Sequence, residues 1–326
     1  GLPVHDVASG VSMQRAFLGT LLRHPVRVGR MMRGDEGTDG VGLMFAAVAG
    51  RMAERTVALV DDWRPDLVLH EPLAGAGPLA AARVGVLTVL VDANLFDPED
   101  QIASVTRNLG DLARRHEVGP LPAPADVVRT SPSSLVGQRR GRPMRFVAGS
   151  SSGGVPDELT RPSSRPTLLV SRSTVEDPRP DRLMTTVVDA AADADVDIVL
   201  VRPDRTVSRR SLPANARTTE WLPHAAVLPH VAGIVHHGGA GTLMTALAAG
   251  APQLVVPGPG DRTVNARLVS ARGAGLAVPL SELTAASLER LAGDASLRAS
   301  AGEVAAEIAA MPPPADLVEP LAALAR

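Results

Sequence analysis

Short apolar runs rich in β-branched residues alternate with segments of helical periodicity through the second half of the chain. We expect strands at 167–171, 197–201, 231–236, 253–257 and 276–278, and helices at 180–193, 242–249, 262–272 and 284–310. Strands that alternate with helices predict a parallel sheet with right-handed crossovers and helices on both faces. Ligands of such sheets bind at the carboxyl ends of the strands.

The first half shows the same alternation in one clear βαβ unit. Its strands are expected at 64–70 and 86–92, with a turn and a short helix at 71–85 between them, and two further helices at 42–62 and about 101–117. The opening residues GLPV predict the entry into a strand. A doubly wound half begins with a βα unit of its own, so we expect that roughly 30 or more residues, the size of one βαβ unit, precede residue 1 in the complete protein.

The sequence HHGGAGT, residues 236–242, is the most informative stretch of the chain. An apolar strand precedes it, and an Ala- and Leu-rich helix closed by Gly250 follows it. The turn therefore lies at a helix N-terminus, where unpaired backbone N–H groups and the helix dipole favour an anion, above all a phosphate. Ser171 and the residues 221–223 also lie at expected strand ends, so three loops should converge on one rim of the sheet.

Composition narrows the function classes. The chain has 326 residues, a length that predicts two domains, and 149–166 is the best candidate for a linker because it is rich in Ser, Gly and Pro. A net charge of −2 argues against a nucleic-acid partner. The absence of cysteine excludes disulfides and thiolate metal sites and fits a cytoplasmic protein. The uncharged segment 221–260 contains five prolines and four histidines, which argues against a membrane span.

The stretch from 221 to 266, WLPHAAVLPHVAGIVHHGGAGTLMTALAAGAPQLVVPGPGDRTVNA, resembles the donor-site signature of GT-B glycosyltransferases. The most similar family is that of the actinobacterial enzymes that attach deoxysugars to antibiotics and related natural products. The resemblance is dense over 170–275 and weaker over 54–96. It implies an α/β fold of two Rossmann-like parallel-sheet domains that face each other across a cleft, the first of which lacks its first βα unit in this sequence.

This resemblance also implies the domain boundaries and the site residues. Residues 1–150 would bind the acceptor, 151–166 would be a linker, 167–315 would bind the nucleotide sugar, and 316–326 would cross back to the first domain. The implied diphosphate-binding residues are His237, Gly239, Ala240, Gly241, Thr242, Ser171 and Ser173. The implied contacts with the nucleobase are Trp221 and Leu222, and those with the donor sugar are Asp261 and Arg262.

Two positions depart from the family pattern. Arg262 stands where the family usually has Gln, and a guanidinium only donates hydrogen bonds, so the preferred sugar can differ. Ser173 replaces a usual glycine, which puts a close backbone approach to the phosphate in doubt. The residue types also allow structural roles. Trp221 could be a core residue, Asp261 could cap the helix 262–272, and we expect His236 to be structural.

An inverting transfer to a hydroxyl needs a base that accepts the proton of the acceptor. In the family this base is a histidine in a Gly-His turn after the first strand, oriented by an acid at a later strand end. Glu71 matches the position of that acid, although an acid near a helix N-terminus is also favoured by the dipole. The Gly-His turn is not in this sequence, so the base stays unassigned.

The sequence thus predicts a metal-independent inverting glycosyltransferase that moves a deoxysugar from a nucleoside diphosphate to a lipophilic aglycone. The nucleotide is expected to be dTDP, although no residue of the sequence distinguishes thymine from uracil. We expect no metal and no cofactor, since the nucleotide sugar is a co-substrate. The Met-, Leu- and Phe-rich residues 11–45 would offer the aglycone an apolar surface. The alternatives are a non-catalytic nucleotide-binding paralogue and a sugar-nucleotide epimerase of the same fold. A homodimer is left open.

Overall fold

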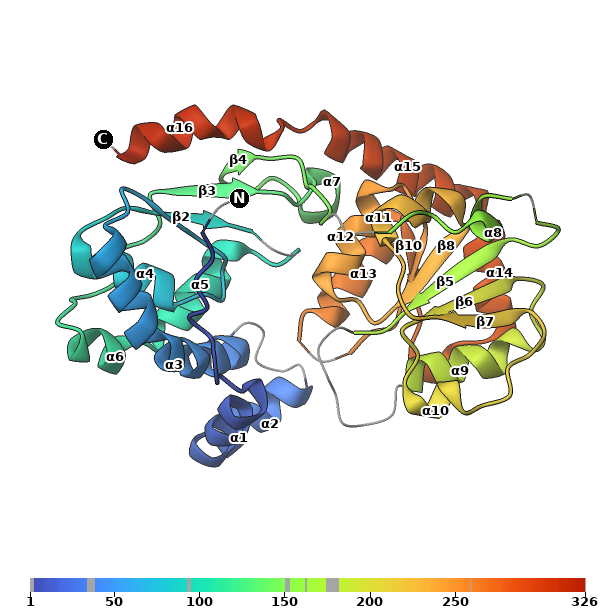
Figure 1. The fold of residues 1–326 in the computed structure, drawn as a ribbon, viewed down its shortest axis with the longest axis horizontal. Coiled ribbons are helices and arrows are strands. Elements are labelled where there is room, and N and C mark those ends of the chain that lie inside the picture. The colour runs from blue at the N-terminus through green and yellow to red at the C-terminus, as the bar shows by residue number, and fades with distance from the viewer. Residues whose placement is uncertain are drawn as a thin grey trace. The chain divides into compact units, whose positions relative to one another are not determined.

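The computed structural model describes residues 3–33, 39–92, 95–149, 153–161, 163–173, 182–258 and 260–325. The chain forms two compact units, each with its own parallel sheet (Figure 1). The first unit comprises residues 1–130, 139–144 and 312–326, and the second comprises 131–138 and 145–311. The last residues of the chain therefore belong to the first unit.

The first unit has a four-stranded sheet in the order β1-β2-β3-β4, and all its pairings are parallel. Its strands are β1 (Val68–His70), β2 (Thr88–Val91), β3 (Asp126–Arg129) and β4 (Arg142–Pro143). Its helices are α1 (Met13–Arg23), α2 (Pro25–Arg33), α3 (Asp39–Trp63), α4 (Ala76–Val84), α5 (Pro98–Arg107), α6 (Gly110–Arg115) and α16 (Val318–Ala322), with the 3-10 turns η3 (Pro314–Leu317) and η4 (Ala323–Ala325).

Small side chains let the helices of the first unit approach closely. Ala46, Ala49 and Ala53 of α3 are buried in one cluster with Leu90 of β2 and residues of α4 and α5. A second cluster brings the C-terminal segment onto the sheet, because Leu317 packs with Val89 of β2 and Val128 of β3. The successive residues Val89 and Leu90 thus serve different clusters, as the alternation of side chains along a strand requires.

Two glycines of α3 make this packing testable. A Cβ on Gly42 would lie 2.6 Å from the backbone carbonyl carbon of Ser104 in α5, whereas a Cβ on Gly50 would meet nothing within 4 Å. We expect Gly42→Ala to destabilise the first unit by about 1–3 kcal/mol through overpacking, and Gly50→Ala to stabilise it by about 0.5–1 kcal/mol through helix propensity. Urea unfolding, followed by Trp63 fluorescence in a Trp221→Phe background, measures both. Equal unfolding midpoints would contradict the close contact between α3 and α5.

The second unit has a six-stranded parallel sheet in the order β10-β9-β8-β5-β6-β7. Its strands are β5 (Thr167–Ser171), β6 (Asp197–Val201), β7 (Ala216–Thr219), β8 (Gly233–His236), β9 (Gln253–Val255) and β10 (Gly275–Ala277). Its helices are α7 (Ser133–Val136), α8 (Asp157–Thr160), α9 (Arg182–Ala191), α10 (Arg205–Ser208), α11 (His224–Val227), α12 (Ala240–Ala248), α13 (Arg262–Arg272), α14 (Ala285–Gly293) and α15 (Ala295–Ala310), with the 3-10 turns η1 (Leu228–His230) and η2 (Leu280–Glu282).

Both faces of this sheet are covered. Leu168 and Val170 of β5 belong to a cluster with α9 and α14, whereas Leu169 belongs to another cluster with α11 and α12. The strand order reverses between β5 and β8: β6 and β7 follow outward from β5, and β9 and β10 follow outward from β8. In a doubly wound sheet such a reversal opens a crevice at the carboxyl ends of the two strands.

The expected α/β fold class with two parallel sheets is confirmed, but some elements differ from the prediction. Residues 101–117 do not form one helix, because α5 ends at Arg107 and α6 begins only at Gly110. The expected strand entry at GLPV is wrong, since residues 3–6 lie in no strand, and residues 1–2 lie outside the described ranges. The strands β3, β4 and β7 were not predicted.

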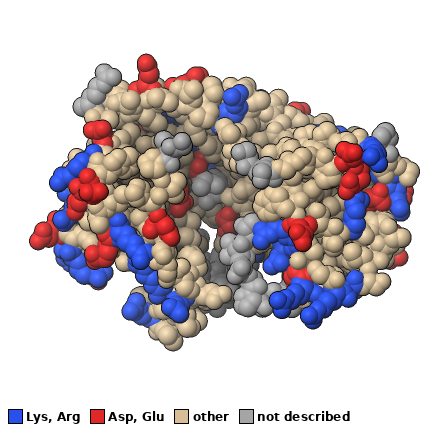
Figure 2. Space-filling view, in the orientation of Figure 1, with Lys and Arg blue, Asp and Glu red and all other residues tan. Residues whose placement is uncertain are grey.

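The expected linker contains structure that belongs to the second unit. Within its described part, α8 buries Leu159 in the cluster with Leu169. Figure 2 shows acidic and basic side chains mixed on the visible face of both units, in keeping with the net charge of −2. Within the described ranges, no helix combines the length and hydropathy needed to cross a membrane.

Candidate functional site

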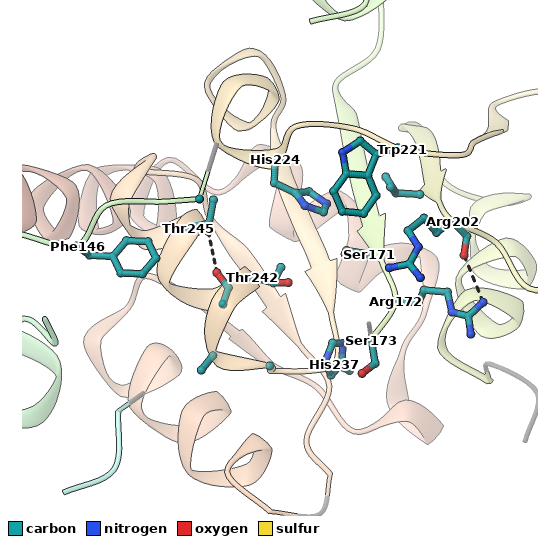
Figure 3. Close-up of a pocket in the computed structure, with 15 residues that line it drawn as sticks. Phe146, Ser171, Arg172, Ser173, Arg202, Trp221, His224, His237, Thr242 and Thr245 are labelled. Carbon is teal, nitrogen blue, oxygen red and sulfur yellow. Dashed lines mark hydrogen bonds between the residues drawn. The ribbon is translucent and has the colours of Figure 1, made fainter. Parts of the chain in front are cut away.

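A cavity of about 440 Å³ lies in the second unit at the carboxyl ends of β5, β6 and β8 (Figure 3). This is the crevice that the reversal of strand order creates, and Ser171 of β5 is in register with His236 of β8 there. The cavity brings together eight residues predicted from the sequence: Ser171, Ser173, Trp221, His237, Gly239, Ala240, Gly241 and Thr242. It is also lined by Phe146, Gly149, Arg172, Val201, Arg202, His224 and Thr245.

The turn between β8 and α12 has the geometry of an anion site. Gly239 is the N-cap residue of α12, and no side chain caps the helix there. Gly239 and the first three residues of α12 all line the cavity. Gly238 has a φ of +84°, a conformation that favours glycine. A Cβ on Gly239 would lie 2.6 Å from Nε2 of His237, so only glycine leaves that imidazole in place.

His236 is fully buried and holds the turn that follows β8 through a hydrogen bond. The backbone N–H of Gly238 donates to its Nδ1 at 3.0 Å. The ring proton is therefore on Nε2, which lies 2.8 Å from Oε1 of Gln253 and donates to it. Burial lowers the pKa of His236 to about 3, against the opposing hydrogen bond with Gln253. His236 thus fixes the shape of the turn as a neutral imidazole.

His237 is only half-buried and lines the cavity. Its pKa is lowered to about 4, first by desolvation and then by the positive charge of Arg262, while the Ser171 backbone acts in the opposite direction. Its buried Nδ1 has no hydrogen-bond partner in the part of the chain that the structure describes. Near neutral pH this side chain is a neutral imidazole with one N–H that could donate to a bound anion.

Trp221 presents an aromatic surface to the cavity, with 49% of the residue exposed. The guanidinium of Arg202 lies 5.7 Å from the ring centroid, within the range of a cation–π contact. Arg202 adopts a φ of +57°, unusual for a residue other than glycine. Its N–H donates to Thr219 O at 2.8 Å, and its carbonyl accepts from Nη1 of Arg172 at 3.5 Å. Leu222 is buried in the core, so only its backbone could contact a ligand.

Asp261 and Arg262 do not line this cavity, but they lie next to the turn. Arg262 approaches Gly238 closely, since a Cβ on Gly238 would lie 3.3 Å from the Arg262 Cα. Asp261 precedes α13 without a side-chain cap bond, and its Oδ2 instead accepts from Nδ2 of Asn265 at 3.0 Å. Asp261 thus occupies the N-cap position of α13, as the alternative role expected, but its side chain makes no cap hydrogen bond. Desolvation raises the pKa of its carboxyl, and the Asn265 hydrogen bond opposes the rise.

Glu71 belongs to the first unit, directly after β1. The Glu71 side chain is exposed. Partial desolvation raises the pKa of its carboxyl, and a hydrogen bond from the backbone N–H of Leu73 opposes this rise. The neighbouring His70 is buried and directed to its own turn, because its Nδ1 lies 3.1 Å from the Glu71 carbonyl oxygen.

Sequence reasoning missed Arg172, Arg202 and His224, which the structure adds to the cavity wall. A signal existed for Arg172 and Arg202, since each directly follows an apolar run at a strand end. Residues 174–181, which follow Ser173, lie outside the described residues. Among the described residues, no group of three or more His, Asp or Glu side chains could hold a metal ion.

Comparisons with known proteins agree with this geometry. A family model for the erythromycin biosynthesis protein CIII-like C-terminal domain matches residues 185–324, and the N-terminal model of the same family matches residues 36–127. The L-demethylnoviosyl transferase of Streptomyces niveus is 35% identical over 279 residues, which are 82% of this chain and 73% of that protein.

Two solved structures extend the comparison. The crystal structure of the glycosyltransferase SnogD from Streptomyces nogalater is 31% identical, with a TM-score of 0.80 over 99% of this chain and 86% of SnogD. The structure of the spinosyn rhamnosyltransferase SpnG complexed with thymidine diphosphate is 26% identical, with a TM-score of 0.78 over 91% of this chain and 84% of SpnG.

The fold, the switch-point cavity and these matches define a glycosyltransferase of the GT-B class. The chain belongs to the erythromycin biosynthesis protein CIII-like family, and the known proteins similar to it are named as sugar transferases.

Proposed function

We propose that this protein is a metal-independent inverting glycosyltransferase that moves a deoxysugar from a dTDP-sugar to a lipophilic natural-product aglycone. The observation that carries the donor half is the cavity at the β5–β8 switch point, where His237, the uncapped N-terminus of α12 and Trp221 meet. The relatives support the choice of sugar and nucleotide, because they transfer deoxysugars and the similar SpnG was solved with thymidine diphosphate.

In the transfer, the acceptor oxygen forms a bond to C1 of the sugar from the face opposite the diphosphate. The bond between C1 and the diphosphate oxygen breaks, and dTDP leaves with the electron pair. The imidazole N–H of His237 and the N–H groups of α12 would donate to the diphosphate as its charge develops, which is electrostatic stabilisation of the leaving group. Thr242, on the first turn of α12, would add a hydroxyl donor, and Ser171 and Ser173 would complete that side.

The remaining residues of the proposed donor site would bind the base and the sugar of the nucleotide sugar. The Trp221 ring would stack on the base, steadied by Arg202, and the backbone of Leu222 would contact the base edge. The Asp261 carboxylate would accept hydrogen bonds from sugar hydroxyls, and Arg262 would donate to the sugar. These residues need no metal ion and no cofactor to hold the donor.

The acceptor half rests on the first unit. The base that takes the acceptor proton stays unassigned in this sequence, and Glu71 would orient that base and stabilise its protonated form. Apolar side chains of α1 and α2 are exposed, among them Leu18, Leu22 and Val26, and would suit a lipophilic aglycone.

The deciding experiment is a calorimetric titration with dTDP, with UDP and thymidine as comparisons. We expect micromolar binding of dTDP, clearly weaker binding of UDP, and weaker binding still of thymidine, which lacks the diphosphate. Quenching of Trp221 fluorescence in a Trp63→Phe background should accompany the binding of dTDP. Transfer is then tested with a panel of dTDP-deoxysugars and polyketide aglycones.

Each result has a separate meaning. No binding of dTDP or UDP would refute the donor site. Equal binding of both nucleotides would refute the preference for thymine. Binding of dTDP without transfer to any acceptor of the panel would favour the non-catalytic nucleotide-binding paralogue.

A further inference from the structure

Asn265 of α13 connects the diphosphate turn with Asp261. Its Nδ2 donates to Gly238 O at 2.9 Å and to Asp261 Oδ2 at 3.0 Å. The Asn265 side chain is fully buried. The amide nitrogen thus donates one hydrogen to the backbone carbonyl of the turn and the other to the Asp261 carboxylate.

This connection continues beneath the turn. Gly238 accepts from Asn265 through its carbonyl and donates to Nδ1 of His236 through its N–H. His236 in turn contacts Gln253 of β9. The peptide groups of Gly238 are therefore held from both sides, and only the Asn265 side leads to a residue of the proposed sugar site.

The position on the helix explains why the contact is built this way. Asp261 and Asn265 are four residues apart, so their side chains lie on the same face at the start of α13. The Asp261 carboxylate makes no cap hydrogen bond with the helix, and its direction is fixed by the hydrogen bond from the Asn265 amide. An aspartate side chain with a fixed direction can accept from a defined sugar hydroxyl, whereas a freely rotating one cannot do so without losing entropy.

We propose that Asn265 is a positioning residue for donor recognition, which orients Asp261 toward the sugar and couples that orientation to the diphosphate turn. This inference rests on the proposed function, because it assumes that the turn binds the diphosphate and that Asp261 binds the sugar. The rival explanation is that Asn265 only fills space between α13 and the turn.

The test separates these two explanations through one ratio, the dissociation constant of dTDP divided by that of a dTDP-sugar. The probes are dTDP, dTDP-glucose and dTDP-L-rhamnose, and the sugar that gives the larger ratio with the wild-type protein is used. A loosened turn would weaken the binding of dTDP and of the dTDP-sugar by the same factor and leave the ratio unchanged. A misdirected Asp261 would weaken only the binding of the dTDP-sugar and so lower the ratio.

The variants are Asp261→Ala, Asn265→Leu and the double variant, in the full chain. We expect Asp261→Ala to lower the ratio about tenfold, as for a lost hydrogen bond to a charged group. Asn265→Leu keeps the branched shape of the side chain but removes both donated hydrogen bonds, and should lower the ratio by about threefold or more. In the Asp261→Ala background, Asn265→Leu should change the ratio no further.

Val269→Ala is the matched control, because Val269 is buried in the same helix and is apolar. It should lower stability without changing the ratio. An unchanged ratio in Asn265→Leu, or losses that multiply in the double variant, would overturn the inference while dTDP binding stands. No binding of dTDP by the wild type would instead refute the donor site, and binding of dTDP with no gain from either sugar would refute the role of Asp261 and this inference together.

Discussion

We expect His237→Ala to reduce the turnover of sugar transfer by about 100-fold or more, the effect of removing one donor that stabilises developing charge. His237 lines the cavity beside the uncapped N-terminus of α12, and desolvation holds its pKa at about 4, so the free protein presents a neutral N–H rather than a cation. This donor gains most when the diphosphate leaves with its full charge. Turnover at saturating donor should therefore fall more than the affinity for dTDP.

Two comparison variants make the His237 result specific. His237→Gln keeps an N–H donor and should retain part of the activity. His230→Ala removes an exposed histidine of η1 in the same unit and should leave turnover unchanged. Steady-state rates and calorimetric dTDP affinities are measured for all three. Wild-type turnover in His237→Ala would show that the imidazole does not act on the leaving group.

The elements that the sequence predicts best are those whose pattern follows from burial alone. β5, β6 and α13 have the predicted ends. The two strands were predicted because TLLVS and DIVLV each contain an unbroken apolar run that is buried in the interior of the sheet. β7 was missed because it is an edge strand, ARTT, with no buried residue. β3 was missed because Asp126 and Arg129 bound a core of only two valines. Edge pairing and short length remove the hydrophobic signal on which such predictions depend.

Some residues of the candidate site can be predicted from the local sequence, and others cannot. Its turn and strand-end residues follow from local sequence, because a glycine-rich turn before a helix has few other uses. Arg202 had a signal in its place after an apolar run at a strand end, but its positive φ and its contact with Trp221 appear only in the folded chain. Asn265 had a local signal in its spacing of four from Asp261, but its bond to Gly238 spans 27 residues and needs the folded sheet.

The two adjacent histidines of β8 and its turn should also make the stability of the second unit depend on pH. Burial lowers the pKa of His236 from 6.5 to about 3 and that of His237 to about 4. Below about pH 6.5 both histidines bind protons in the unfolded chain but stay neutral in the folded chain. The free energy of unfolding therefore falls as the pH falls. Each histidine contributes about 1.4 kcal/mol per pH unit, until the pH reaches its folded value.

For His236 alone this amounts to about 2 kcal/mol between pH 6.5 and pH 5. A proton on Nδ1 would also remove the acceptor of the Gly238 N–H and so open the turn. We expect His236→Asn, whose side-chain oxygen can still accept from Gly238, to flatten the acid limb of the stability curve by about 1.4 kcal/mol per pH unit. Urea unfolding from pH 8 to pH 5, followed by Trp221 fluorescence in a Trp63→Phe background, measures this slope. His230→Asn is the control for the loss of a histidine, and a slope in His236→Asn equal to that of the wild type would mean that His236 is not held neutral by burial.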